Sequence, residues 1–143
     1  MTQDRHIPPV AAWLGYGGLI PFFAGALACW LGGDAGEMAL VALRAYGAAI
    51  LAFLGGVPWG FAARDGVVGA GERLIVGVVP ALIAWLTLLV PPAVGLWVLL
   101  AAFIALYAWD HGRNLAAAPA WFARLRAHLT VGVAAALVLA LAA

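Results

Sequence analysis

Five long apolar runs constrain the fold of this chain more than any other feature. They cover about residues 11–31, 39–62, 74–90, 93–109 and 120–143. The charges inside them are Arg44 in the second run, and Arg124 and Arg126 near the start of the fifth. An apolar helix needs about 17 to 25 residues to cross a hydrocarbon core about 30 Å thick, and each run has such a length. We therefore predict five membrane spans.

The fold class follows from the continuity of these runs. Apolar residues follow one another without the alternation that strands of a membrane barrel require, which favours helices. Charged residues make up only 9 % of the chain and hydrophobic residues 67 %, whereas a soluble domain has about 25 % charged residues. We predict an all-α integral membrane protein, a five-transmembrane-helix bundle that forms a single domain over residues 1–143. This composition excludes a nucleic-acid-binding protein.

Turn-forming residues separate the apolar runs. Glycine and aspartate lie at Gly32-Gly33-Asp34, at Arg64-Asp65-Gly66 and at Asp110–Asn114, where we expect spans to end. Only Pro91 and Pro92 separate the third run from the fourth, so these two spans are predicted to be antiparallel neighbours.

The arginines predict the orientation in the membrane. All but one of them lie before the first run, between the second and third, or from the end of the fourth run to the first turns of the fifth: Arg5, Arg64, Arg73, Arg113, Arg124 and Arg126. By the positive-inside rule the N-terminus is cytoplasmic and the C-terminus is outside. We expect the bacterial inner (cytoplasmic) membrane; in a mitochondrion the same side would face the matrix.

The tryptophans agree with this orientation. The predicted inner interface holds Trp13, Trp59, Trp109 and Trp121, and the outer one holds Trp30 and Trp97. This is typical of an aromatic belt at headgroup level. A tryptophan-rich ligand cage is the alternative interpretation.

Small residues at four-residue spacing predict helix contacts, because lipid gives helices no hydrophobic reason to associate. Three rows have this spacing: Ala24, Ala28 and Gly32; Ala48, Ala52, Gly56 and Gly60; and Gly132, Ala136 and Ala140. The first two are predicted to face the inside of the bundle. The third serves either packing within the chain or contact with a partner chain.

Pro21 and Pro58 are predicted to bend the first two spans. The segment Gly55–Gly60 then has the least regular backbone, and freed carbonyls of this kind can line a cavity. The candidate pocket consists of Tyr46, Gly55, Gly56, Pro58, Trp59 and Trp85. A kink that serves only helix packing is the alternative.

Arg44 is the one charged residue well inside a predicted membrane span, which makes it a candidate site. It lies about one helical turn from the predicted outer boundary, so its side chain can reach the interface, pair with Glu37, or bind an anion or lipid headgroup.

The inner interface holds the other polar candidates: Asp110, His111, Trp121, Arg124 and Arg126. We expect Arg124 and Arg126 to contact anionic headgroups beside Trp121. The predicted topology also brings His6, His111 and His128 to this side, which makes them a weak candidate cluster for a metal ion or haem. Nothing in their spacing enforces such a site, and no cofactor is assigned.

Several segments resemble the membrane family called domain of unknown function 3429 (transmembrane protein 69-like). The resemblance rests on the segments Gly18-Leu-Ile-Pro-Phe22, Tyr46–Gly60, Pro80–Trp85, Asp110, and Pro119–Arg126 with Leu129-Thr130. It implies a small helical bundle and no established activity. Pro58 departs from the family, which commonly has a histidine before the Trp-Gly pair. This chain therefore cannot carry out any chemistry of that histidine in the same way.

A catalytic set is missing from the sequence. The chain has no serine, no histidine is predicted on the side of Cys29, and no two carboxylates form an acid–base pair. We expect a non-enzymatic small integral membrane protein that contacts lipids and serves as a partner or assembly subunit of a larger membrane complex, or as a homo-oligomer. The alternative is a binder or sensor of a lipophilic ligand (quinone, porphyrin or lipid) in an intramembrane pocket.

Overall fold

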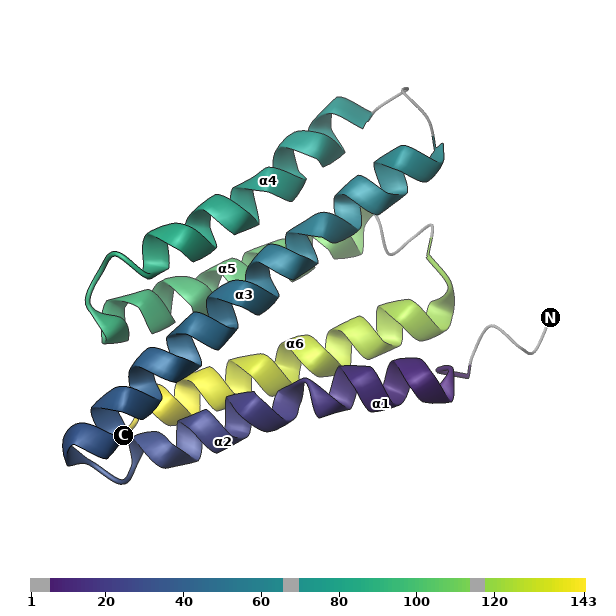
Figure 1. Ribbon diagram of the computed structural model, residues 1–143. Coiled ribbons are helices and arrows are strands. Elements are labelled where there is room, and N and C mark those ends of the chain that lie inside the picture. The colour runs from purple at the N-terminus through teal and green to yellow at the C-terminus, as the bar shows by residue number, and fades with distance from the viewer. Residues whose placement is uncertain (1–5, 66–69, 114–117) are drawn as a thin grey trace.

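The computed structural model describes residues 6–65, 70–113 and 118–143; Arg5, Gly66 and Asn114 of the sequence predictions lie outside these ranges. The described residues form six α-helices and no β-strand, which confirms the all-α prediction. Figure 1 shows the helices arranged as a bundle. They are α1 (Pro9–Gly17), α2 (Leu19–Cys29), α3 (Gly33–Asp65), α4 (Ala70–Thr87), α5 (Pro92–Arg113) and α6 (Ala120–Leu141).

Four segments of the described chain are long and apolar enough to cross a membrane. They are Pro9–Cys29, which joins α1 and α2, and Gly33–Arg64, Pro92–Arg113 and Ala120–Leu141. The chain is therefore an integral membrane protein. The helix α4 has 18 residues, carries Glu72 in its first turn, and is not among the four.

The first apolar run forms two helices instead of the single predicted one. The helix α1 ends at Gly17, and α2 begins at Leu19 after Gly18. Pro21 explains this position, because it lacks the N–H that would bond to the carbonyl of Gly17 and its ring crowds that carbonyl. Tyr46 of α3 donates a hydrogen bond to the carbonyl oxygen of Gly18 at 3.0 Å. A neighbouring helix thus satisfies a backbone acceptor at the break.

The helix α3 begins at Gly33, earlier than the predicted start near residue 39. Gly32 and Gly33 have φ values of 68° and 53°, in the left-handed region that glycine adopts without strain. They reverse the chain within a tight turn, so the helix begins at once. Asp34 lies in the first turn, where a carboxylate interacts favourably with the helix dipole.

The helix α5 continues past its predicted end. Asp110 was expected to end this span, but it lies inside the helix, which extends to Arg113. The side chain of Asp110 is almost fully buried. A tertiary contact, and not a helix end, therefore explains an aspartate at this position.

The row of small residues on α6 faces the inside of the bundle. Ala136 and Ala140 are buried, and a Cβ added at Gly132 would lie 2.7 Å from Cδ1 of Leu19. Gly132 of this row therefore packs against α2, and Ala136 and Ala140 lie inside the bundle, as expected for packing within the chain.

The other two rows are only partly internal. Ala48 is buried, but Gly56 and Gly60 are exposed, and a Cβ at either would meet nothing within 4 Å. On α2 the buried residues are Phe22, Ala26 and Cys29, whereas Ala24 and Gly32 are exposed. The buried face of α2 thus lies beside the predicted row, where Phe22 contacts Tyr46 of α3.

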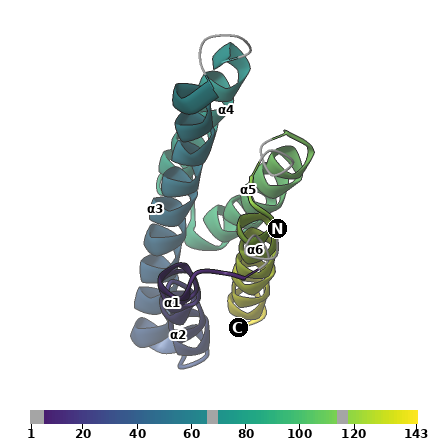
Figure 2. The ribbon, with the colours of Figure 1, turned by 90° about the vertical axis from the view of Figure 1, so that its right-hand side faces the viewer.

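The long helix α3 contacts different partners along its length. Gly25 of α2 lies against Leu43, and further along α3 the residue Gly55 lies against Gly77 and Pro80 of α4. Figure 2 shows α3 beside α1 and α2 at one end and beside α4 at the other. Trp59 adds a hydrogen bond of 3.0 Å from its Nε1 to the carbonyl of Leu74.

The helices α1–α2 and α6 run in the same direction. Tyr16 of α1 contacts His128 near the start of α6, and Trp30 after α2 contacts Leu139 near the end of α6. The start of α1 and the end of α6 therefore lie toward opposite ends of the bundle (Figure 1).

Candidate functional site

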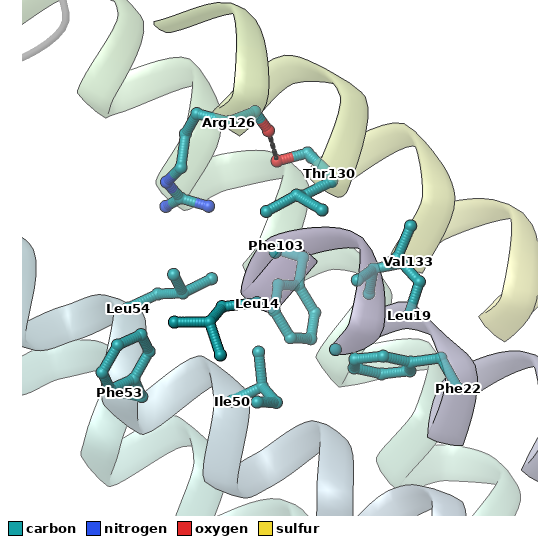
Figure 3. Close-up of a pocket in the computed structure, with 13 residues that line it drawn as sticks. Leu14, Leu19, Phe22, Ile50, Phe53, Leu54, Phe103, Arg126, Thr130 and Val133 are labelled. Carbon is teal, nitrogen blue, oxygen red and sulfur yellow. Dashed lines mark hydrogen bonds between the residues drawn. The ribbon is translucent and has the colours of Figure 1, made fainter. Parts of the chain in front are cut away.

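A pocket lies where the break between α1 and α2 meets α3, α5 and α6. Its free volume is about 130 Å³. Its lining is apolar except for Arg126 and Thr130: Leu14, Gly15, Gly18, Leu19, Phe22, Ile50, Phe53, Leu54, Phe103, Leu129 and Val133 complete it. Figure 3 shows Arg126 and Thr130 of α6 across the pocket from the apolar side chains of α3.

Aromatic contacts fix the inner wall of this pocket. The ring of Phe22 lies edge-on to Phe103 at 6.1 Å between centroids and edge-on to Tyr46 at 5.0 Å. Phe22 and Phe103 are buried. Edge-to-face pairs at such separations are favourable, and the hydroxyl of Tyr46 is held by Gly18. The helix break and the wall beside it are therefore held in place by α3 and α5.

Arg126 is held by a buried salt bridge. Its Nη2 donates to Oδ2 of Asp110 at 2.9 Å, and the two side chains are 5 % and 1 % exposed. The pair connects α6 to α5. A buried carboxylate and guanidinium are stable only as partners, because each alone carries a large desolvation cost.

The same arginine has an unsatisfied donor. Among the described residues, Nε of Arg126 is buried and has no acceptor. The hydroxyl of Thr130 donates its hydrogen to the carbonyl of Arg126 at 2.9 Å, so that hydrogen is already used within α6. A buried N–H without an acceptor is costly, so an acceptor that reaches Nε would stabilise the site.

The pocket differs in place from the one expected near residues 55–60. None of the predicted residues, Tyr46, Gly55, Gly56, Pro58, Trp59 and Trp85, lines it. Gly55 and Trp59 pack against α4, Gly56 is open, Pro58 is buried in an unbroken helix, and Trp85 faces outward. Tyr46 supports the pocket wall from behind. The glycines at residues 55 and 77 serve close helix contact, so no cavity is left between them.

Arg44 is buried at the other end of the bundle. Its Nη1 donates to the carbonyl of Val90 at 2.5 Å, and its aliphatic stem lies on Gly95. Glu37, one of the alternatives considered for Arg44, is exposed. Arg44 instead binds the turn that joins α4 to α5, where carbonyls beyond a helix end attract a cation.

The remaining polar candidates do not come together. His6, His111 and His128 are exposed; His111 lies near Tyr107, and Nδ1 of His128 lies 2.9 Å from the hydroxyl of Tyr16. The described ranges contain no group of three His, Cys, Asp or Glu side chains that could hold a metal ion. Trp121 packs edge-on against Phe122, and Arg124 is exposed.

The prediction for Arg126 was wrong. This residue was expected to contact lipid headgroups together with Arg124, but it is buried beside Asp110. The available sequence signal was an aspartate and an arginine on consecutive spans, both placed at the inner interface. An acid and a base that the topology brings to one depth are a pairing signal.

One family model and one curated relative match this chain. The model of the family described as Protein of unknown function (DUF3429) matches residues 7–142. The chain is 40 % identical over 132 residues to Transmembrane protein 69 of Xenopus tropicalis, an alignment that covers 89 % of this chain and 51 % of that protein. The chain thus spans about half the length of this curated relative, and no solved structure matches. On this match the chain belongs to the DUF3429 family.

Proposed function

We propose that this chain is a non-enzymatic membrane protein that binds a lipophilic small molecule in the pocket between α1–α2, α3, α5 and α6. The observation that carries the proposal is a buried arginine with an unsatisfied Nε in the wall of an otherwise apolar pocket. Ligand sites typically combine apolar walls with a few polar groups that orient the ligand.

The size of the pocket supports a small ligand group. A dry cavity of about 150 Å³ accepts benzene, and this pocket has about 130 Å³. The pocket is on the scale of a single ring, whereas a porphyrin, with four linked rings, is far larger. Of the ligand classes expected from the sequence, a quinone or the polar end of a lipid remains.

The pocket opens toward the surface that faces lipid. Leu14 and Phe53 line it from α1 and α3, and each is 74 % exposed. A ligand ring in the pocket can therefore keep its alkyl tail among lipid chains. This supports a ligand that enters from the bilayer.

The proposed membrane arrangement has five passes, with α4 as the third. The parallel course of α1–α2 and α6 supports it, since these are the first and last passes. The N-terminus then faces the cytoplasm and the C-terminus the outside of a bacterial inner membrane. The arginines at the predicted inner side support this orientation.

Service as a subunit of a larger complex stays a prediction. It rests on the missing catalytic set, on the missing soluble domain and on the row of small residues on α6, in which Gly132 packs against α2. The ligand-binding proposal is the one that the pocket geometry supports.

Val133→Phe tests the proposal by filling the pocket. Val133 is buried in its wall, whereas Val131 on the same helix is exposed, so Val131→Phe is the matched control. We expect gently purified wild type and the control to retain one lipophilic molecule, measured by extraction and mass spectrometry with an absorption spectrum. Overpacking of about 1–3 kcal/mol predicts a loss of about 5- to 150-fold in the retained molecule for Val133→Phe. Wild-type protein that carries only bulk lipid would contradict the proposal.

A further inference from the structure

We infer that the ligand is a quinone-class molecule, which presents an uncharged ring carbonyl to Arg126 and leaves its alkyl tail in the bilayer. This inference rests on the proposed function and names the ligand class of the same pocket.

The charge balance of the site selects an uncharged group. Arg126 cannot lose its proton in a protein, but Asp110 lies 2.9 Å away and already balances its charge. A carboxylate or phosphate added here would be a second anion in a buried, apolar place, where an uncompensated charge is very costly. The pocket therefore disfavours fatty acids and phospholipid phosphates.

The donors of the site select an acceptor. Within the described part of the chain, Nη2 of the guanidinium donates to Asp110, and Nε is buried without an acceptor. The hydroxyl hydrogen of Thr130 is committed to a backbone carbonyl. A carbonyl oxygen accepts a hydrogen bond and brings no donor of its own that would need a partner among apolar walls.

The shape of the site selects a ring. The free volume is about 130 Å³, close to the cavity that holds a single benzene ring. Phe22 and Phe103 form a rigid aromatic wall, against which a flat ring can lie. The exposed positions of Leu14 and Phe53 leave an exit for a tail.

Three probes with one ring and one tail test this inference. They are decyl-1,4-benzoquinone, decylbenzene without an acceptor, and 4-decylbenzoate with a negative charge. Their partition between empty nanodiscs and nanodiscs that hold the full chain measures binding. We expect wild type to bind the quinone at least about tenfold more tightly than decylbenzene, because a hydrogen bond to a charged donor distinguishes them. The benzoate should bind no better than decylbenzene.

Asp110→Asn tests the role of charge balance. It keeps the shape of the side chain and removes the charge, so Arg126 is left with an excess positive charge in the pocket. We expect 4-decylbenzoate to bind this variant at least about tenfold more tightly than it binds wild type. The wild-type probe series needs no variant and stays decisive if Asp110→Asn does not fold.

The outcomes separate the two proposals. Equal binding of all three probes, or preference for the benzoate in wild type, would overturn the quinone inference and leave the ligand-binding pocket in place. A methyl ester of a long-chain fatty acid that binds as tightly as the quinone would place the carbonyl on a lipid and overturn the ring assignment. No binding of any probe above empty nanodiscs would overturn the proposed function itself.

Discussion

Arg126→Met is expected to lower the stability of the bundle by about 3–5 kcal/mol, the largest effect of any single change considered. It removes the guanidinium that lies 2.9 Å from the buried carboxylate of Asp110, and removing one partner of a buried ion pair costs about that much. The two side chains are almost completely buried, so solvent does not screen the loss. Unfolding of the purified protein in mixed micelles, followed by circular dichroism, measures the change.

Arg124→Met is the matched control for this prediction. Arg124 lies two residues before Arg126 on the same helix and is exposed. We therefore expect its replacement to change the stability by no more than about 0.5 kcal/mol. The double variant Asp110→Leu with Arg126→Met should recover most of the loss, because it removes both charges together. A double variant as unstable as Arg126→Met alone would show that the unpaired carboxylate is not the cause of the lost stability.

Gly55→Ala is expected to destabilise the contact between α3 and α4 by about 1–3 kcal/mol, as overpacking does in close-packed interiors. A Cβ at residue 55 would lie 2.6 Å from the carbonyl oxygen of Gly77, a backbone atom that cannot move without shifting α4. The same thermal or denaturant unfolding measures the loss.

Gly56→Ala is the adjacent control. A Cβ there would meet nothing within 4 Å, and alanine in a helix is about 0.5–1 kcal/mol more favourable than glycine. We expect Gly56→Ala to be neutral or stabilising. If both alanine variants have the same effect, the close approach of α3 and α4 at Gly55 is contradicted.

The helices were predictable because each apolar run is itself a local signal. The runs and the helix-breaking residues between them are visible one segment at a time, so the all-α membrane fold followed from the sequence. The ends were less predictable. Asp110 has the character of a helix end, but its carboxylate is neutralised by a residue of the next helix, and a local pattern does not contain that partner.

The position of the pocket also depends on tertiary partners that a local sequence pattern does not contain. Two proline-containing segments were expected to be irregular, around Pro21 and around Pro58. Which of them borders a cavity depends on what packs beside it: Gly77 approaches Gly55 closely, whereas the break at Gly18 is flanked by larger side chains that leave space. That difference lies in side chains from other helices, so spacing along one helix does not reveal it.

Photolabelling by an alkylbenzoquinone with a diazirine at the first carbon of its tail tests the central claim most directly. The claim is that a lipophilic carbonyl compound sits in the pocket beside Arg126. The account predicts labelled peptides from residues 50–54 of α3 and 129–133 of α6, lost when excess decyl-1,4-benzoquinone competes. Labelling confined to lipid-facing residues such as Trp97 and Val138, unaffected by competitor, would contradict it.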